Sequence, residues 1–199
     1  MKYLITILLL LAAAAYSADT LSDIPCPFGL TWGKPLPKSV VCSEIDTANG
    51  LKFCTTKAVP KPVKRFDLYI IVSTPKGVSK VIAMGETIED DQYGTDITNA
   101  YSDLIELLRE KYGDPSNTFY WYGSHVLYTE PRHFWECMRE EGCSRYVTAW
   151  RDGQIFLEIK YLGEYGKQGY LNLAYESPAH TDYLNKFREK QRESDKDNL

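Results

Sequence analysis

The residues best suited to chemistry in this sequence are five cysteines and three histidines. The cysteines are Cys26, Cys42, Cys54, Cys137 and Cys143. Thiols form disulfides in an oxidising compartment, and five thiols leave at least one without a partner inside the chain. Short separations around turn glycines favour the pairs Cys42–Cys54 and Cys137–Cys143. Cys26 is then the free or intermolecular thiol, although spacing alone does not fix the connectivity.

A zinc site is the alternative use of the second cysteine pair. His133 and Cys137 are four residues apart in an expected helix and would share one face, with Cys143 close behind. Such soft ligands hold zinc. No second Cys/His pair at a metal-ligand spacing follows, and an exported thiol pair oxidises readily. The sequence therefore favours a disulfide, and we expect no metal and no cofactor.

The hydroxyls and carboxylates form no recognisable catalytic motif. Gly123-Ser124-His125 lacks the Gly-x-Ser-x-Gly frame of a hydrolase, and adjacent residues of a strand point to opposite faces. Glu89-Asp90-Asp91 and Glu140-Glu141 are acids in expected turns, where we expect them to be solvated. The sequence thus indicates no catalytic residue.

Aromatic residues are the more suggestive candidates for binding. The chain has 15 tyrosines and 4 tryptophans, including Tyr120, Trp121 and Tyr122 in one expected strand. Tyr120 and Tyr122 would face one side of that strand and Trp121 the other. Exposed Tyr and Trp offer rigid, amphipathic contact surface to a sugar ring or a protein. The alternative is that these side chains fill and rim a sheet, as aromatics commonly do.

Residues 1–17 have the anatomy of an export signal. Lys2 gives a positive start before the uncharged apolar run 4–15, and small Ala15 and Ser17 predict a mature start at Ala18. A cut after Ala18 and a buried N-terminal helix are the alternatives. The run is shorter than the roughly 20 residues that cross a bilayer, so we expect no stable membrane span after its removal. The sequence predicts a periplasmic or secreted protein.

The elements that must position these residues follow from periodicity and turn signals. The stretch 18–64 contains six prolines and is expected to be irregular, with 28–33 as a short strand and turn that places Trp32 in the core. A stripe of Ile97, Tyr101, Leu104, Leu108 and Tyr112 predicts a long helix over 96–112, capped by Thr95 or Asp96. Further helices are expected over 131–141 and 180–193, and strands over 65–73, 78–88, 117–128, 145–151, 154–162 and 169–176.

These elements predict an α+β fold stapled by disulfides. Successive strands should form an antiparallel sheet, with one long helix packed on one face and short helices around it. The domain should cover 65–180, with the Pro-rich segment 18–64 packed on it and an exposed helix or tail over 181–199.

Three short pieces carry a resemblance to a known group of proteins. They are Phe28-Gly29-Leu30-Thr31-Trp32-Gly33, then Tyr93-Gly94-Thr95, and Lys111-Tyr112-Gly113-Asp114-Pro115. In these pieces the chain resembles exported proteobacterial proteins of unknown function over most of its mature region. The shared residues are turn glycines and core aromatics, so the resemblance implies an exported protein and no functional site.

Composition narrows the function classes. The formal net charge is −4 with no basic stripe, so nucleic acid is not an expected partner. We favour a non-catalytic binding protein of the cell envelope, of inhibitor, immunity or accessory type, whose aromatic surface contacts another envelope protein or a glycan. The alternative is an envelope enzyme acting on cell-wall material, with His125 or His133 meeting a carboxylate in a cleft.

Overall fold

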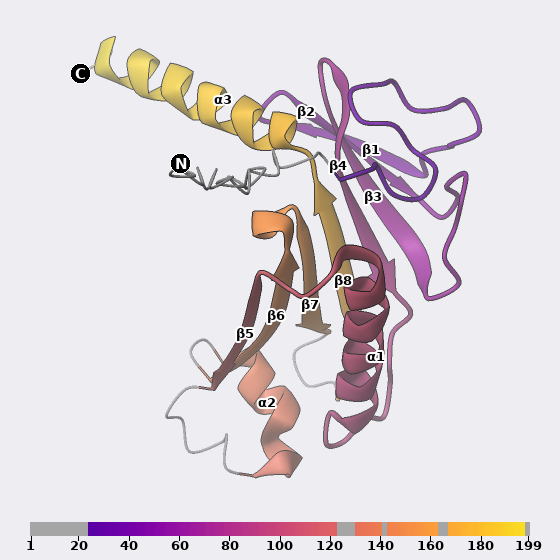
Figure 1. The fold of residues 1–199 in the computed structure, drawn as a ribbon. Coiled ribbons are helices and arrows are strands. Elements are labelled where there is room, and N and C mark those ends of the chain that lie inside the picture. Colours follow the sequence, from indigo (N-terminus) through magenta and orange to yellow (C-terminus); the bar gives the residue numbers. More distant parts are fainter. Residues whose placement is uncertain (1–23, 123–129, 141–142, 163–166, 198–199) are drawn as a thin grey trace, which may run out of the picture.

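The computed structural model describes residues 24–122, 130–140, 143–162 and 167–197, and within these ranges the side chains of 119–122, 131, 144 and 197 lie outside the description. Its centre is an eight-stranded sheet in the order β1-β2-β3-β4-β8-β7-β6-β5, in which every neighbouring pair is antiparallel (Figure 1). The strands are β1 (Glu44–Ala48), β2 (Leu51–Thr56), β3 (Phe66–Thr74), β4 (Gly77–Gly85), β5 (Asn117–Tyr122), β6 (Ser144–Trp150), β7 (Ile155–Tyr161) and β8 (Gly169–Glu176). The helices are α1 (Thr95–Tyr112), α2 (Phe134–Arg139) and α3 (Pro178–Asp197), with 3₁₀ turns η2 (Pro131–His133) and η3 (Arg151–Gly153).

Two four-stranded meanders meet at the middle of this sheet. Strands β1 to β4 follow one another in space, β5 to β8 do so in reverse order, and β4 pairs with β8. The connection between the meanders contains α1, as Figure 1 shows. The predicted α+β class, the antiparallel sheet and its stapling by disulfides are therefore confirmed.

One face of the sheet carries the hydrophobic core. Val81, Leu157 and Leu173 alternate with more exposed neighbours along β4, β7 and β8 and are almost fully buried. Helix α1 packs on β7 and β8, and α2 packs on β6 and β7. The Tyr101 hydroxyl of α1 lies 2.7 Å from the buried Thr148 hydroxyl of β6. The helix stripe predicted from the sequence is thus the layer that seals this face; its buried members are Ile97, Tyr101, Leu104, Ile105 and Leu108.

The prediction that residues 18–64 are irregular is wrong for the second half of this segment. Residues 44–56 form the hairpin β1/β2, and β2 pairs with β3. Asn49 and Gly50 supply the turn with φ values of 53° and 72°, a left-handed pair that favours two-residue hairpins. The six prolines lie before and after this hairpin and not within it, so they do not interrupt its strands.

The strand expected at the start of 28–33 is also wrong, because Phe28 and Gly29 both adopt left-handed backbone and form a turn. Trp32 is half-buried against the core, and its indole N–H donates to the Ile24 carbonyl at 2.7 Å. The segment is thus held by packing and one indole hydrogen bond, which a strand pattern does not predict.

A buried carboxylate caps the N-terminus of helix α1, and the sequence did not predict this cap. Gly94, with φ 71°, occupies the N-cap position and has no side chain to offer. The Asp91 carboxylate accepts instead from the Ile97 backbone N–H at 3.0 Å, and the Trp135 indole N–H donates to the Asp91 carbonyl. Thr95 and Asp96 are therefore not the caps, and Asp91 is not a solvated acid: only 5% of it is exposed.

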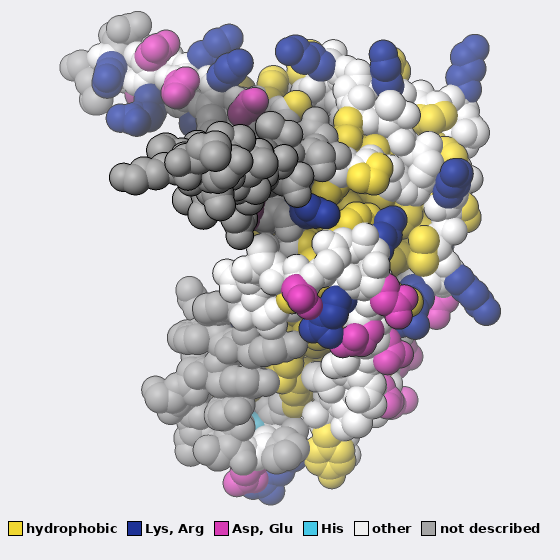
Figure 2. Space-filling model, viewed as in Figure 1, with side chains coloured by type: hydrophobic (Ala, Val, Ile, Leu, Met, Phe, Trp, Pro, Cys, Tyr) yellow, Lys and Arg dark blue, Asp and Glu magenta, His cyan; other side chains and the backbone are white. Residues whose placement is uncertain are grey.

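Helix α3 extends the chain away from the sheet (Figure 1). The exposed C-terminal helix expected over 180–193 is present and is longer, and charged side chains of both signs lie along it in Figure 2. Its first turn is anchored where His180 Nδ1 lies 3.0 Å from the buried Ser79 hydroxyl of β4. The Ser177 hydroxyl also donates to the Ser79 carbonyl at 2.9 Å. No helix among the described residues is long and apolar enough to cross a membrane.

Two disulfides staple the ends of this architecture, as predicted. Cys42 bonds to Cys54 of β2, and Cys137 of α2 bonds to Cys143 immediately before β6. The second bond consumes both thiols on which the zinc alternative depended. Cys26 takes part in neither bond.

Removing the Cys42–Cys54 disulfide by a double substitution to Ala should lower the free energy of unfolding by about 2–3 kcal/mol, because the unfolded chain regains loop entropy. Urea unfolding followed by circular dichroism measures this loss. Cys26→Ala is the matched control and should cost less than about 1 kcal/mol, because it breaks no cross-link. An unchanged urea midpoint in the double variant would show that the bond is not a staple.

The unfolding free energy should fall as the pH drops below the ordinary histidine pKa. Burial lowers the pKa of His180 below 6.5. The Glu176 charge opposes this shift and the Lys80 charge adds to it. Because its pKa is lower in the folded state, the contribution of His180 to the free energy of unfolding is complete above about pH 6.5. That contribution falls as the pH drops towards the folded-state pKa, by at most about 1.4 kcal/mol per pH unit. Urea midpoints at about pH 7.5 and 5.5 should differ less in His180→Gln than in the native protein. Equal pH dependence in the two proteins would contradict the role of His180.

Candidate binding surface

The second face of the central strands is not covered by α1 or α2. Side chains of an antiparallel strand alternate between faces, so the residues between the core positions of β4, β8, β7 and β6 point away from the two helices. We call this the open face, defined by Lys80, Ile82, Arg145, Val147, Phe156, Glu158, Asn172 and Ala174. These residues line a shallow hollow of about 330 Å³. The hollow draws on three consecutive strands, β6, β7 and β8, and on β4, which is distant from them in the sequence.

The floor of the hollow is apolar. Cross-strand pairing aligns Ile82 with Ala174 and Ala174 with Phe156, which gives a continuous row across β4, β8 and β7. Val147 of β6 lies opposite Glu158, in the neighbouring row. Phe156 remains 37% exposed, although it is a large apolar side chain in the middle of a sheet. Exposed apolar area ringed by polar groups is typical of interaction sites.

The rim of the hollow is charged and internally paired. Lys80, Arg145 and Glu158 line the hollow, and Lys160 and Glu176 lie just outside it, two residues beyond the lining residues of β7 and β8. Arg145 Nη2 lies 3.2 Å from Glu158 Oε1, and Lys160 Nζ lies 2.8 Å from Glu158 Oε2. On the opposite side, Lys80 Nζ lies 2.9 Å from Glu176 Oε2. Both carboxylates are therefore engaged by cations, an arrangement that suits recognition better than proton transfer.

Glu176 shows the electrostatic effect of this pairing. Burial raises its pKa, but hydrogen bonds from Lys80 and Thr181 favour the charged form and lower the pKa below its usual range. A carboxyl group that must lend a proton needs the opposite shift. Glu176 therefore serves as a fixed counter-charge at neutral pH.

The aromatic candidates of the sequence lie in β5, at one edge of the same sheet. Trp121 occupies the register position opposite Arg145, whereas Tyr120 and Tyr122 occupy those opposite Tyr146 and Ser144. Cross-strand partners share a face, so position 121 belongs to the open face and positions 120 and 122 to the other. The side chains of these three residues lie outside the described part of the structure.

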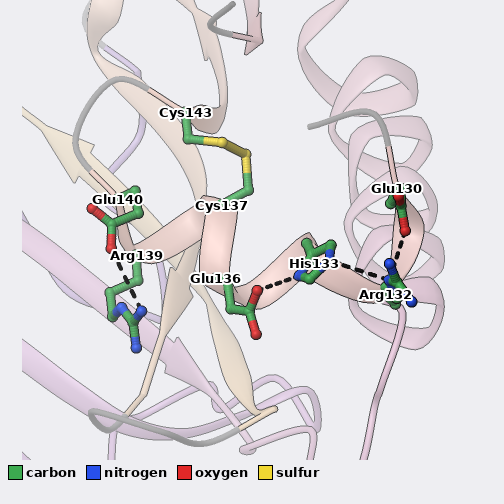
Figure 3. A network of polar contacts seen from close by, with 8 residues as sticks. All are labelled: Glu130, Arg132, His133, Glu136, Cys137, Arg139, Glu140 and Cys143. Carbon is green, nitrogen blue, oxygen red and sulfur yellow. Dashed lines mark hydrogen bonds and ion pairs between the residues drawn. A yellow bond between two sulfur atoms is a disulfide. The ribbon is translucent and has the colours of Figure 1, made fainter. Parts of the chain in front are cut away.

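A second group of polar residues surrounds η2 and α2 (Figure 3). Arg132 Nε lies 2.6 Å from Glu130 Oε2 and donates to His133 Nε2 at 3.2 Å. His133 Nδ1 meets the Glu136 carboxylate one helical turn further on. A histidine thus does contact a carboxylate, as the enzyme alternative required. Glu136 is half exposed, however, and the hollow on the open face is lined by other residues.

The remaining histidines give the enzyme alternative no further support. His125, with Gly123 and Ser124, lies outside the described residues. His180 is 4% exposed and contacts the Ser79 hydroxyl, which itself donates to the Val72 carbonyl. Ser79 is 1% exposed, so substrate has no access to it. This pair holds α3 to the sheet.

The free thiol is not built for catalysis. Burial raises the pKa of Cys26 to about 12. A reactive cysteine requires a lowered pKa and access to its partner. Cys26 therefore packs as a half-buried apolar group against the core.

No family model, curated protein or solved structure matches the chain. Sequence reasoning missed the open face, because its members come from separate strands. One signal was present: Glu158 and Lys160 alternate with the apolar core residues of β7.

Cys26 should react slowly with a disulfide reagent such as dithionitrobenzoate at about pH 8. Its raised pKa leaves little thiolate, and half-burial restricts access, so reaction in the native state should be more than ~10-fold slower than in denaturant. In denaturant one thiol per chain should react, since the other four are bonded. Equal rates in the two conditions would contradict the burial of Cys26.

Proposed function

We propose that this chain is an exported, non-catalytic binding protein of the cell envelope, of inhibitor, immunity or accessory type, that acts through the open face. The observation that carries the proposal is the apolar floor of Ile82, Phe156 and Ala174 on the sheet face opposite α1 and α2, where Phe156 stays 37% exposed although Ala174 beside it is buried. An apolar centre surrounded by polar side chains is the usual anatomy of a protein interface.

Location outside the cytoplasm is part of the same proposal. Two disulfides in one small domain are typical of secreted and periplasmic proteins, because cytosolic thiols are kept reduced. The export signal expected over residues 1–17 points to the same compartment.

The edge strand β5 extends the proposed binding surface. Trp121 falls in register with Arg145 on the open face, and Tyr120 does not. We therefore expect Trp121→Ala to weaken binding more than Tyr120→Ala. This separates two aromatic residues that the sequence could only treat together.

A rigid, stapled scaffold supports this role over catalysis. The carboxylates at the hollow are bound by cations, and the buried serine and histidine support α3. A binding protein needs only a stable surface, whereas an enzyme of cell-wall material would need a tuned acid and base beside a cleft.

The test is quantitative affinity enrichment from a periplasmic extract with three oxidised baits: native protein, Phe156→Asp and Leu107→Asp. Leu107 is the matched control, because it is a large apolar residue 48% exposed on α1. A charge on the floor should reduce capture of the true partner at least ~10-fold, since it would bury an unpaired carboxylate. The control should keep native capture.

Circular dichroism must first show that both variants fold. A purified partner should then reproduce the difference by calorimetry. If native protein enriches nothing, or if both variants lose the partner equally, the open face is not the binding surface.

A further inference from the structure

We propose that the partner is a protein whose contact surface presents an apolar side chain among acidic ones. This inference rests on the proposed function and specifies its chemistry. It is based on the solvent exposure of the charged side chains at the rim of the open-face hollow.

The cations of the rim are more exposed than the anions that pair with them. The side chains of Arg145, Lys160 and Lys80 are 60%, 41% and 26% exposed. Glu158 and Glu176 are only 17% and 19% exposed. Glu158 thus lies beneath Arg145 and Lys160, and an approaching molecule meets their positive charge first, whereas Lys80 and Glu176 are nearly equally exposed.

The charge at the rim is opposite in sign to the net charge of the whole chain. The formal net charge is −4, yet the rim counts three cations against two carboxylates, and Arg145 and Lys160 are the outermost of these groups. Charges at an interface select partners by complementarity of sign. Acidic side chains around a central apolar group would meet Arg145 and Lys160 while the apolar group covers Phe156.

The same features favour a protein over other anionic molecules. Nucleic acids and sulfated glycans bring dense charge and little apolar surface, and they need basic stripes that the sequence lacks. The floor of Ile82, Phe156 and Ala174 would then remain uncovered. A protein side chain supplies both the apolar contact and the flanking carboxylates.

The experiment uses end-blocked peptides EELEE, QQLQQ and KKLKK as probes, with a heparin disaccharide as the anionic glycan. Each is titrated into the full oxidised protein and followed by two-dimensional amide NMR. EELEE should shift the amides of Val147, Phe156 and Asn172 and bind about tenfold more tightly than QQLQQ. That ratio is what two or three exposed charge pairs supply. KKLKK should bind more weakly still.

A charge-matched pair of variants locates the preference. Arg145→Gln/Lys160→Gln should abolish the advantage of EELEE over QQLQQ. Arg188→Gln/Lys196→Gln removes the same charges from exposed positions on α3 and should leave the advantage intact. Equal loss in both variants would mean that net charge, and not the rim, attracts the acidic peptide.

The remaining outcomes separate this inference from the proposed function. If EELEE and QQLQQ bind the hollow equally, acidic selection is wrong while binding by the open face stands. If no peptide shifts the amides of the hollow, the inference is wrong, and the Phe156→Asp enrichment decides the proposed function. If the disaccharide binds the same amides at least as tightly as EELEE, the partner is an anionic glycan and not a protein.

Discussion

The structure depends on the unequal covering of one antiparallel sheet. Strand alternation gives every strand two sets of side chains, but α1 and α2 pack on only one of them. The sealed set contains Leu157, Leu173 and Val81, and it supplies the hydrophobic stability of the domain. The other set is therefore free to vary in chemistry without loss of the core, and it is here that apolar and charged residues meet around one hollow.

Further contacts fasten the two helices to the strands that carry that surface. The Cys137–Cys143 bond holds α2 beside β6, and the Asp91 carboxylate fixes the start of α1 while its carbonyl receives the Trp135 indole N–H. Both helices are thus tied to each other and to the strands whose opposite sides form the open face. A surface held in place before binding would lose little conformational entropy, which favours the proposed binding role.

Much of this fold could be predicted locally, because periodicity and turn chemistry act over a few residues. Strand β7, helix α1 and the two disulfides follow from such signals. The hairpin β1/β2 was missed although Asn49-Gly50 marks its turn, since the nearby prolines suggested irregular chain. The Asp91 cap was missed although Ile97 is only six residues away, because Asp91 stands among acids of an expected turn and glycine occupies the N-cap position itself. The open face was missed because it depends on which distant strands become neighbours: β4 pairs with β8 across about ninety intervening residues.

Site-specific photo-crosslinking inside cells tests the central claim most directly. A benzoylphenylalanine placed at position 156 lies on the floor of the hollow, and one placed at position 107 lies on the exposed side of α1. The account predicts a discrete heavier adduct with a second protein from position 156 after irradiation, and none from position 107. An adduct from position 107 alone, or from neither position, would contradict a binding role for the open face.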